Sequence, residues 1–238
     1  MKELVLGGLK VRLVGGSDGH GGGEGPVVIL LHGFGAPGDD LVPLAEVMDA
    51  PRETRWLFPE APLSLNMGLG DSRAWWIIDF ARIQADREAG RIRDLSVEVP
   101  QGLALARERF LAFLKELPEQ FPIDYKRTVI GGFSQGAMLT CDAVLHTDSP
   151  FTGLVQLSGN LLAREIWAPL MGKRKGLPVF QSHGAQDDIL PHIGAERLRD
   201  ALHHAGLDVE WHDFLGGHEI PESALRRLSA FITKRLSA

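Results

Sequence analysis

Short runs of consecutive aliphatic residues alternate along this chain with helix-like patterns, and that alternation limits the fold more than any other feature. The run Val27-Val-Ile-Leu-Leu31 contains no polar residue, which is typical of a strand buried on both faces. Comparable strands are predicted at residues 54–58, 128–131, 153–157, 177–182 and 209–214. Strands that alternate with helices predict an α/β fold with a mostly parallel central sheet and helices on both faces.

Apolar residues at helical spacing mark the segments between these strands. Helices are predicted at residues 100–117, 137–146, 191–205 and 221–236. Another helix is expected directly after Asp39 or Asp40, because either side chain can cap it and the apolar residues that follow recur at helical spacing.

The length of 238 residues favours one domain over the whole chain, 1–238. The glycine-rich run at residues 15–25 separates two short β-like segments from the rest, but these are too few to form a core, so we interpret it as a connection within the domain. The irregular segment at about residues 60–98 is the candidate for a small inserted cap or lid.

The charge balance and cysteine content exclude several classes of protein. The formal net charge of −6 argues against a nucleic-acid partner, because phosphate binding requires clustered positive charge. The single cysteine, Cys141, excludes an intrachain disulfide framework. No apolar stretch has the length of a transmembrane span or a secretory signal, so we expect a cytoplasmic protein.

A candidate nucleophile lies at the end of a predicted strand. Gly132-x-Ser134-x-Gly136 follows Val129-Ile130 and precedes a helical run, as the G-x-S-x-G elbow of serine hydrolases requires. The same pattern occurs in Gly15-Gly-Ser17-Asp-Gly19, but Ser17 lies in a glycine loop with no helix after it. The context therefore favours Ser134 as the nucleophile and Ser17 as a chance match.

A serine hydroxyl needs a histidine base and an acid that orients the base. Several histidines follow Ser134: His146, His203 and His204 are expected on helices and His212 inside a strand, whereas His218 lies in the glycine-containing loop after the last strand. We therefore expect His218 to be the base. Either Asp187 or Asp188 could orient it, since both follow a strand, and spacing alone does not choose between them.

Two backbone amides are expected to stabilise a negatively charged oxygen during the reaction. One belongs to Gln135, the residue after the nucleophile, and the other to Phe34 in the loop Leu31-His-Gly-Phe-Gly35. Both follow predicted strands, where ligands bind in sheets of this kind.

The nucleophile and oxyanion motifs occur together with five others, in the order Leu31-His-Gly-Phe-Gly35, Phe58-Pro-Glu-Ala-Pro62, Ala74-Trp-Trp76, Gly131-Gly-Phe-Ser-Gln-Gly136, Leu157-Ser-Gly159, His183-Gly-Ala-Gln-Asp187 and Gly217-His218. Jointly they resemble the carboxylesterase/phospholipase branch of the α/β-hydrolases, which includes acyl-protein thioesterases. The resemblance implies the α/β-hydrolase fold and Asp187 as the acid. The charged stretch from Arg82 to Asp94 looks longer than in small relatives, which could alter the substrate range.

A substrate pocket is expected beside Ser134, in the irregular segment. Apolar side chains there suggest an acyl-binding wall, although they could equally pack the loop against the sheet: Leu63, Leu65, Met67, Trp75 and Trp76. No metal or organic cofactor is implied, and the histidines lack a zinc-binding spacing.

The sequence thus predicts a serine esterase that acts on small to medium acyl esters through an acyl-enzyme intermediate. A thioesterase acting on acylated proteins or acyl-CoA is the alternative, because the same three residues serve both chemistries. A non-catalytic binding module is a remote alternative, since such a module needs none of Ser134, Asp187 and His218. The sequence does not define the oligomeric state and is compatible with a homodimer.

Overall fold

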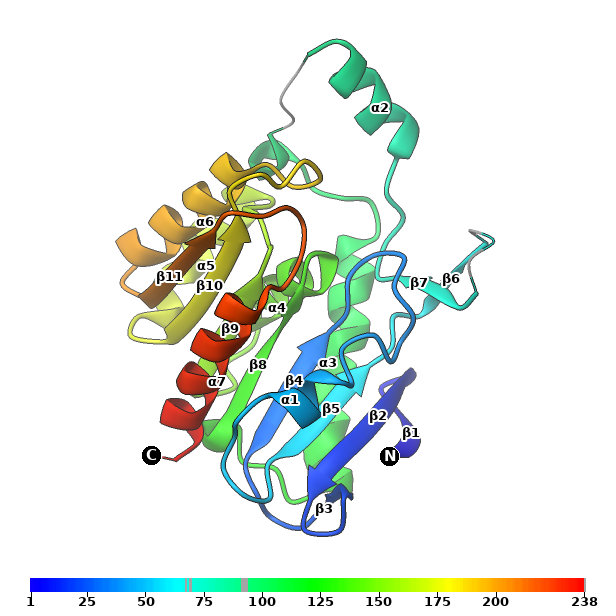
Figure 1. Ribbon diagram of the computed structural model, residues 1–238, viewed down its shortest axis with the longest axis vertical. Coiled ribbons are helices and arrows are strands. Elements are labelled where there is room, and N and C mark those ends of the chain that lie inside the picture. Colours follow the sequence, from blue (N-terminus) through cyan, green and yellow to red (C-terminus); the bar gives the residue numbers. More distant parts are fainter. Residues whose placement is uncertain (67, 69, 91–93, 238) are drawn as a thin grey trace.

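A central sheet of nine strands runs through the molecule (Figure 1). The computed structural model describes residues 1–66, 68, 70–90 and 94–237. The strands lie in the order β1-β2-β5-β4-β8-β9-β10-β11, and β3 pairs with β2. Their bounds are Lys2–Leu6 (β1), Leu9–Gly16 (β2), His20–Gly22 (β3), Val27–Leu31 (β4), Arg55–Pro59 (β5), Thr128–Phe133 (β8), Gly153–Leu157 (β9), Pro178–Gly184 (β10) and Asp208–Phe214 (β11).

The sheet is mostly parallel, as predicted. All pairings from β5 to β11 are parallel, whereas β2 runs antiparallel to both β1 and β5. The carboxyl ends of six strands therefore meet at one edge, the upper one in Figure 1. Loops that leave this edge can place residues from distant parts of the sequence side by side.

Helices cover both faces of the sheet (Figure 1). Residues of α3 (Leu103–Gln120), α4 (Gln135–Leu145), α5 (Arg164–Met171) and α6 (His192–His204) pack in one apolar cluster with Val27, Ile29 and Leu31 of β4. Residues of α7 (Glu222–Leu236) pack on the other side with Val28 and Leu30. Alternate residues of β4 thus face two separate apolar layers, which explains why this strand contains no polar position.

The prediction of a helix capped by Asp39 or Asp40 is wrong in the length of the helix and in its cap. Only α1 (Leu44–Val47) forms, its N-cap is Pro43, and no side chain caps it. The residues before it make turns in which an amide bonds the carbonyl three residues back, as Val42 does to Asp39. Proline has no amide hydrogen to donate, so Pro43 cannot extend a regular helix backwards from α1.

The segment at about residues 60–98 contains more regular structure than the sequence suggests. A two-stranded sheet of β6 (Leu63–Leu65) and β7 (Ser72–Ala74) precedes helix α2 (Phe80–Glu88), which stands apart from the sheet in Figure 1. Arg91, Ile92 and Arg93 lie outside the described residues. Beyond them, Asp94 forms an ion pair of 2.8 Å with Arg197 on α6. A cap over the site remains a prediction for this segment.

Two further segments differ from expectation. The glycine-rich run at residues 15–25 takes part in the sheet, because Gly15 and Gly16 end β2 and His20–Gly22 pairs with it. Helix α5 was not predicted at all. No helix in the described part of the chain is long and apolar enough to cross a membrane.

Candidate active site

Ser134 occupies a strained turn between β8 and α4. Its backbone angles, φ 54° and ψ −118°, lie in a region that side chains rarely adopt. Two hydrogen bonds hold the turn: the Ser134 amide donates to Leu157 O at 2.8 Å, and the Met138 amide donates to Ser134 O at 3.1 Å. Strain of this kind persists where the surrounding structure enforces it, and it is typical of a nucleophile elbow.

The glycines on either side of Ser134 are required by close contacts between backbone segments. A Cβ atom on Gly136 would lie 2.2 Å from Leu31 O, and one on Gly132 would lie 2.5 Å from the same oxygen. Neither glycine has a positive φ. The motif therefore lets β4 and the start of α4 approach each other closely, while Ser134 itself takes the unusual backbone angle.

The three residues expected to react together lie in one hydrogen-bonded chain. His218 Nε2 is 2.8 Å from Ser134 Oγ, and His218 Nδ1 is 2.7 Å from Asp187 Oδ2. The three side chains come from the ends of β8, β10 and β11, which meet at the carboxyl edge of the sheet. In this order a carboxylate orients a histidine that can take the hydroxyl proton.

Asp187 is buried, and protein groups donate hydrogen bonds to its carboxylate. Its Oδ1 accepts the amides of Ile189 and Leu190 at 2.9 and 2.8 Å, and its Oδ2 faces His218 and His183. Burial opposes ionisation, but hydrogen bonds from His183, His218 and Leu190 outweigh it and hold the pKa of Asp187 well below its usual range. The carboxylate is therefore charged at neutral pH. Asp188 is exposed.

The expected oxyanion loop lies against the nucleophile. A Cβ on Gly33 would lie 3.3 Å from Ser134 Cβ, so the backbone just before Phe34 adjoins the serine. Gln135 is the first residue of α4, and the amides of a helix's first turn have no partner within the helix. The structure thus brings the Phe34 loop and the Gln135 amide to the same serine, while their role in binding an oxyanion remains a prediction.

Buried side chains brace this loop. His32 Nε2 accepts the Ala61 amide at 3.0 Å, so Nδ1 carries the hydrogen that bonds Gly33 O at 2.8 Å. Burial lowers the pKa of His32 and keeps the ring neutral, as this pattern requires. Trp75 Nε1 donates to His32 O at 2.9 Å, and the Gln135 side chain accepts the Trp75 amide at 2.8 Å. These contacts fix the shape of the loop.

The residues expected to form an acyl-binding wall fall into three groups. Leu63 and Leu65 on β6 are half-buried, and Met67 lies outside the described residues. Trp75 and Trp76 are almost fully buried in the apolar cluster that contains α3. Their burial favours packing against the sheet over direct contact with a substrate.

His183 takes part in the site although the sequence argument gave it no role. Its ring lies 3.2 Å from Asp187 Oδ2, and the signal was present in the sequence as the first residue of the His183-Gly-Ala-Gln-Asp187 motif. Of the other histidines, His203 and His204 are exposed at the end of α6. Among the residues that the structure describes, no group of three or more His, Cys, Asp or Glu could hold a metal ion.

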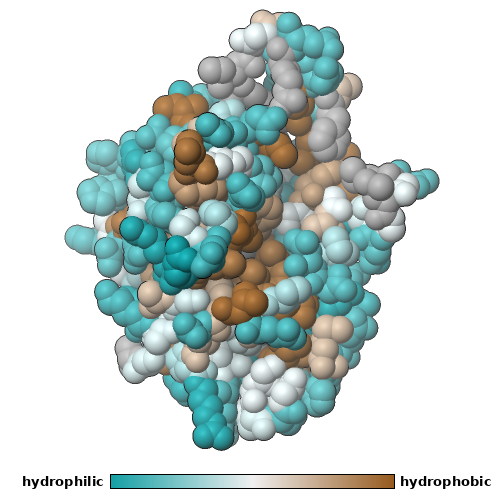
Figure 2. Space-filling model, in the orientation of Figure 1, coloured by the Kyte–Doolittle hydropathy of each residue, from teal (hydrophilic) through white to brown (hydrophobic). Residues whose placement is uncertain are grey.

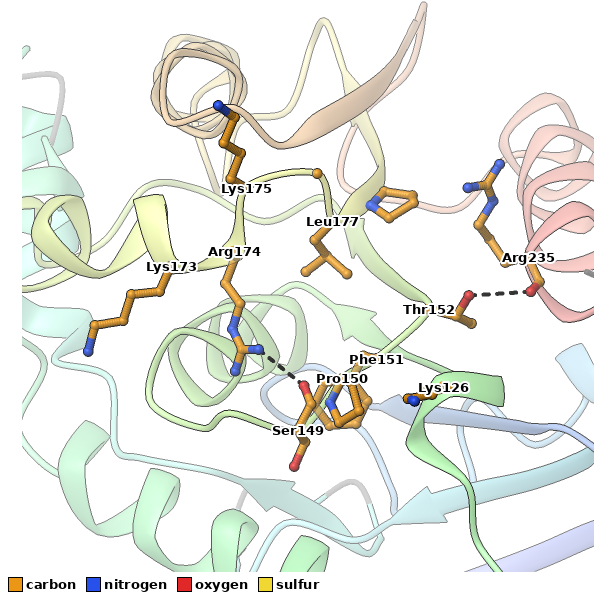
Figure 3. Close-up of a pocket in the computed structure, with 12 residues that line it drawn as sticks. Lys126, Ser149, Pro150, Phe151, Thr152, Lys173, Arg174, Lys175, Leu177 and Arg235 are labelled. Carbon is orange, nitrogen blue, oxygen red and sulfur yellow. Dashed lines mark hydrogen bonds between the residues drawn. The ribbon is translucent and has the colours of Figure 1, made fainter.

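A cavity of about 420 Å³ lies at the opposite edge of the sheet (Figure 3). Its lining residues include 149–152, which lead into β9, and 173–178, which lead into β10, so it opens where the parallel strands begin. Lys126, Arg174 and Arg235 give it a basic lining. It is separate from the Ser134 site.

The chain is similar to known hydrolases along nearly its whole length. The family model described as phospholipase/carboxylesterase matches residues 21–236. Acyl-protein thioesterase 1 of Gibberella zeae is 28% identical over 222 residues, covering 88% of this chain and 90% of that protein, and its namesake from Neurospora crassa is 29% identical over 218 residues, covering 88% and 86%. The crystal structure of esterase PE8 superimposes with a TM-score of 0.79 at 28% identity, covering 96% of this chain and 99% of that chain. The expected α/β-hydrolase fold is confirmed.

Proposed function

The chain belongs to the phospholipase/carboxylesterase family of α/β-hydrolases, and we propose that it is a serine carboxylesterase acting on small to medium acyl esters through an acyl-enzyme intermediate. One observation carries the proposal, namely the continuous hydrogen-bonded chain from Asp187 through His218 to Ser134. Ser134 is the nucleophile, His218 the general base and Asp187 the carboxylate that orients it.

The hydrogen-bond geometry assigns the first protons. Asp187 is ionised and can only accept, so His218 Nδ1 carries a hydrogen and Nε2 accepts the hydroxyl hydrogen of Ser134. As Oγ attacks the ester carbonyl carbon, His218 takes the hydroxyl proton and becomes an imidazolium beside the Asp187 charge. The carbonyl oxygen gains negative charge, which the Phe34 and Gln135 amides stabilise.

The remaining steps reverse the direction of proton transfer. The bond between the carbonyl carbon and the alkoxy oxygen breaks as the imidazolium protonates that oxygen. The alcohol departs, and the acyl group stays bound to Ser134. A water molecule then attacks the acyl carbon while His218 takes one of its protons. Breakdown of this second intermediate returns the proton to Ser134 Oγ and releases the carboxylic acid.

Exposed apolar side chains beside the acid and base support an acyl substrate. Ile189, two residues after Asp187, has 61% of its surface exposed, and Leu215, three residues before His218, has 85% exposed. Hydrophobic residues also gather along the middle of the face drawn in Figure 2. Apolar side chains gathered on one face, as in Figure 2, are typical of a binding site for an apolar group.

A thioesterase remains the second candidate because two similar proteins are named acyl-protein thioesterase 1. The two activities differ only in the atom that leaves, oxygen or sulfur. An oxygen ester and a thioester with the same acyl chain, whose leaving groups differ only in the oxygen or sulfur atom, distinguish them. A higher kcat/KM on the oxygen ester supports the carboxylesterase, and a higher value on the thioester supports the alternative.

Covalent labelling tests the proposed function most directly. A fluorophosphonate should form one adduct per chain, and peptide mass spectrometry should locate it at Ser134. Denatured protein is the control, because labelling there reports chemical reactivity without the folded site. An adduct elsewhere, or none on the folded protein, contradicts the proposal.

A further inference from the structure

His183 is a fully buried histidine on β10, one residue before the strand ends. Its Nε2 lies 2.8 Å from Leu190 O and 3.2 Å from Asp187 Oδ2. The proposed ester hydrolysis requires one histidine and one carboxylate, so the chemistry described above leaves this second histidine without a task.

The contact with Leu190 assigns the hydrogen on the His183 ring. A carbonyl oxygen can only accept, so Nε2 must carry a hydrogen and donate it. The same nitrogen also lies 3.2 Å from Asp187 Oδ2, close enough for its N–H to interact with the carboxylate. The Leu190 amide in turn donates to Asp187 Oδ1 at 2.8 Å, so His183 and Asp187 are linked through Leu190 as well as by the 3.2 Å contact between Nε2 and Oδ2.

We propose that His183 is a positioning residue for the catalytic carboxylate, whose Nε2–H fixes Asp187 Oδ2 where it receives His218 Nδ1–H. The inference rests on the proposed function, since it assigns a role within the same site.

The need for such a residue follows from the shape of a carboxylate. The amides of Ile189 and Leu190 both donate to Oδ1, which leaves rotation about the bond to the carboxyl carbon controlled by the partners of Oδ2. With His183 present, Oδ2 has a buried donor that stays in place when His218 moves between serine and leaving group. A positioned acceptor keeps His218 in one tautomer and one orientation.

A role in packing alone does not explain the residue. His183 Nδ1 is buried without a hydrogen-bond partner among the described residues, and an unpaired buried polar atom destabilises the fold. A residue that only filled this space would be favoured as an apolar one of similar size. The donor at Nε2 therefore offers an advantage that packing does not.

Two substitutions distinguish the effect of the His183 N–H donor from the effect of the side chain's volume. His183→Met keeps the approximate size and removes the donor, whereas His183→Gln keeps a side-chain N–H. On a p-nitrophenyl ester we expect His183→Met to lower kcat roughly 10- to 100-fold, the usual range for losing a hydrogen bond to a charged group, with KM within about twofold. His183→Gln should recover kcat to within about fivefold of the wild type. Equal losses in the two variants, or full activity in His183→Met, would overturn the inference.

The tautomer of His183 in the wild-type protein provides a test that needs no variant to fold. Long-range ¹H–¹⁵N correlation spectra should show His183 protonated at Nε2, and protonation at Nδ1 alone overturns the inference. The outcomes also separate the two proposals. A wild-type protein that takes no fluorophosphonate at Ser134 contradicts the proposed function, and the positioning role fails with it. Normal wild-type labelling with an undiminished His183→Met contradicts the positioning role alone.

Discussion

Two segments of this chain share the pattern G-x-S-x-G, and their structures have little else in common. Gly132 to Gly136 joins β8 to α4 at the edge where the parallel strands end. Gly15 to Gly19 ends β2 and turns towards β3. Since Gly15 pairs with Arg55 at the start of β5, the second segment lies at the opposite edge of the sheet.

Glycine has a different task in each segment. Gly15, Gly16 and Gly19 all have φ between 71° and 75°, so there it permits left-handed turns, although a Cβ on Gly15 or Gly16 would also lie 2.2 or 2.3 Å from a backbone oxygen. In the elbow the positive φ belongs to Ser134, and the glycines permit contacts that a Cβ would block. The same letters therefore encode left-handed glycines in one place and a strained serine between glycines of negative φ in the other.

Nearby acid and histidine residues do not make the first segment a site. Asp18 and His20 are close in sequence to Ser17, but Asp18 Oδ1 accepts the amides of His20 and Gly22 at 2.7 and 2.9 Å. His20 Nδ1 lies 3.1 Å from the amino group of Met1. The hydrogen-bonded chain of Ser134, His218 and Asp187 arises instead from residues far apart in sequence that the parallel sheet brings to one edge.

The largest difference between the segments should appear on removing each hydroxyl. Ser134→Ala should lower kcat/KM for a p-nitrophenyl ester by about 10⁴- to 10⁶-fold, because triad residues act as a unit. Ser17→Ala should stay within about twofold, since Ser17 is exposed at the other edge of the sheet. Similar losses in both variants would contradict the assignment of the nucleophile.

The acid should show the next largest effect. Asp187→Asn should lower kcat by about 10⁴-fold, because an amide favours the wrong tautomer of His218. Asp188→Asn, the matched change at the exposed neighbour, should stay within about threefold. Steady-state kinetics with circular dichroism on both variants provides the measurement, and an equal or larger loss for Asp188→Asn would reverse the assignment.

Most of the sheet could be predicted from the sequence because strands buried on both faces have a distinctive composition. The predicted bounds of Val27–Leu31 and Gly153–Leu157 agree with the structure. Helix α2 stands apart from the sheet in Figure 1, and a helix that does not pack a face against the sheet needs no apolar periodicity. Helix α5 contains Pro169, which argues against a helix in a local reading.

The candidate site was predictable where the chemistry demands particular residues in a particular order. Ser134 and His218 follow from that order, whereas it leaves Asp187 and Asp188 open and the resemblance to the family chooses Asp187. The structure brings Ser134, Asp187 and His218 together. His183 and His32 act through backbone and carboxylate contacts made only in the folded chain, so a local pattern does not reveal them. Trp75 and Trp76 are almost fully buried, which favours the packing alternative that the sequence left open for them.

Replacing glycine by alanine should lower the stability of the fold by different amounts at Gly136 and at Gly19. Gly136→Ala should lower the free energy of unfolding by about 3 kcal/mol or more, because its Cβ would lie 2.2 Å from Leu31 O and 2.6 Å from His32 O. Gly19→Ala should cost about 1 kcal/mol, since its φ is 75° but the space around it is open. Urea unfolding measures both, and equal losses would contradict the distinction.

The smallest effect concerns Asp18, whose pKa is lowered by hydrogen bonds from the amides of Gly22 and His20. A folded-state pKa below the unfolded value means that the charge stabilises the fold above the unfolded pKa and that this contribution is lost as the pH falls through the folded one. The stability difference between the wild type and Asp18→Asn should therefore be largest near about pH 6 and shrink towards about pH 3. This stability difference should be smaller than the loss of stability in Gly19→Ala. Asp18 is exposed, and an asparagine side chain can still accept hydrogen bonds from both amides. Urea midpoints at the two pH values measure it, and a difference that widens on acidification would show that the Asp18 charge opposes the turn.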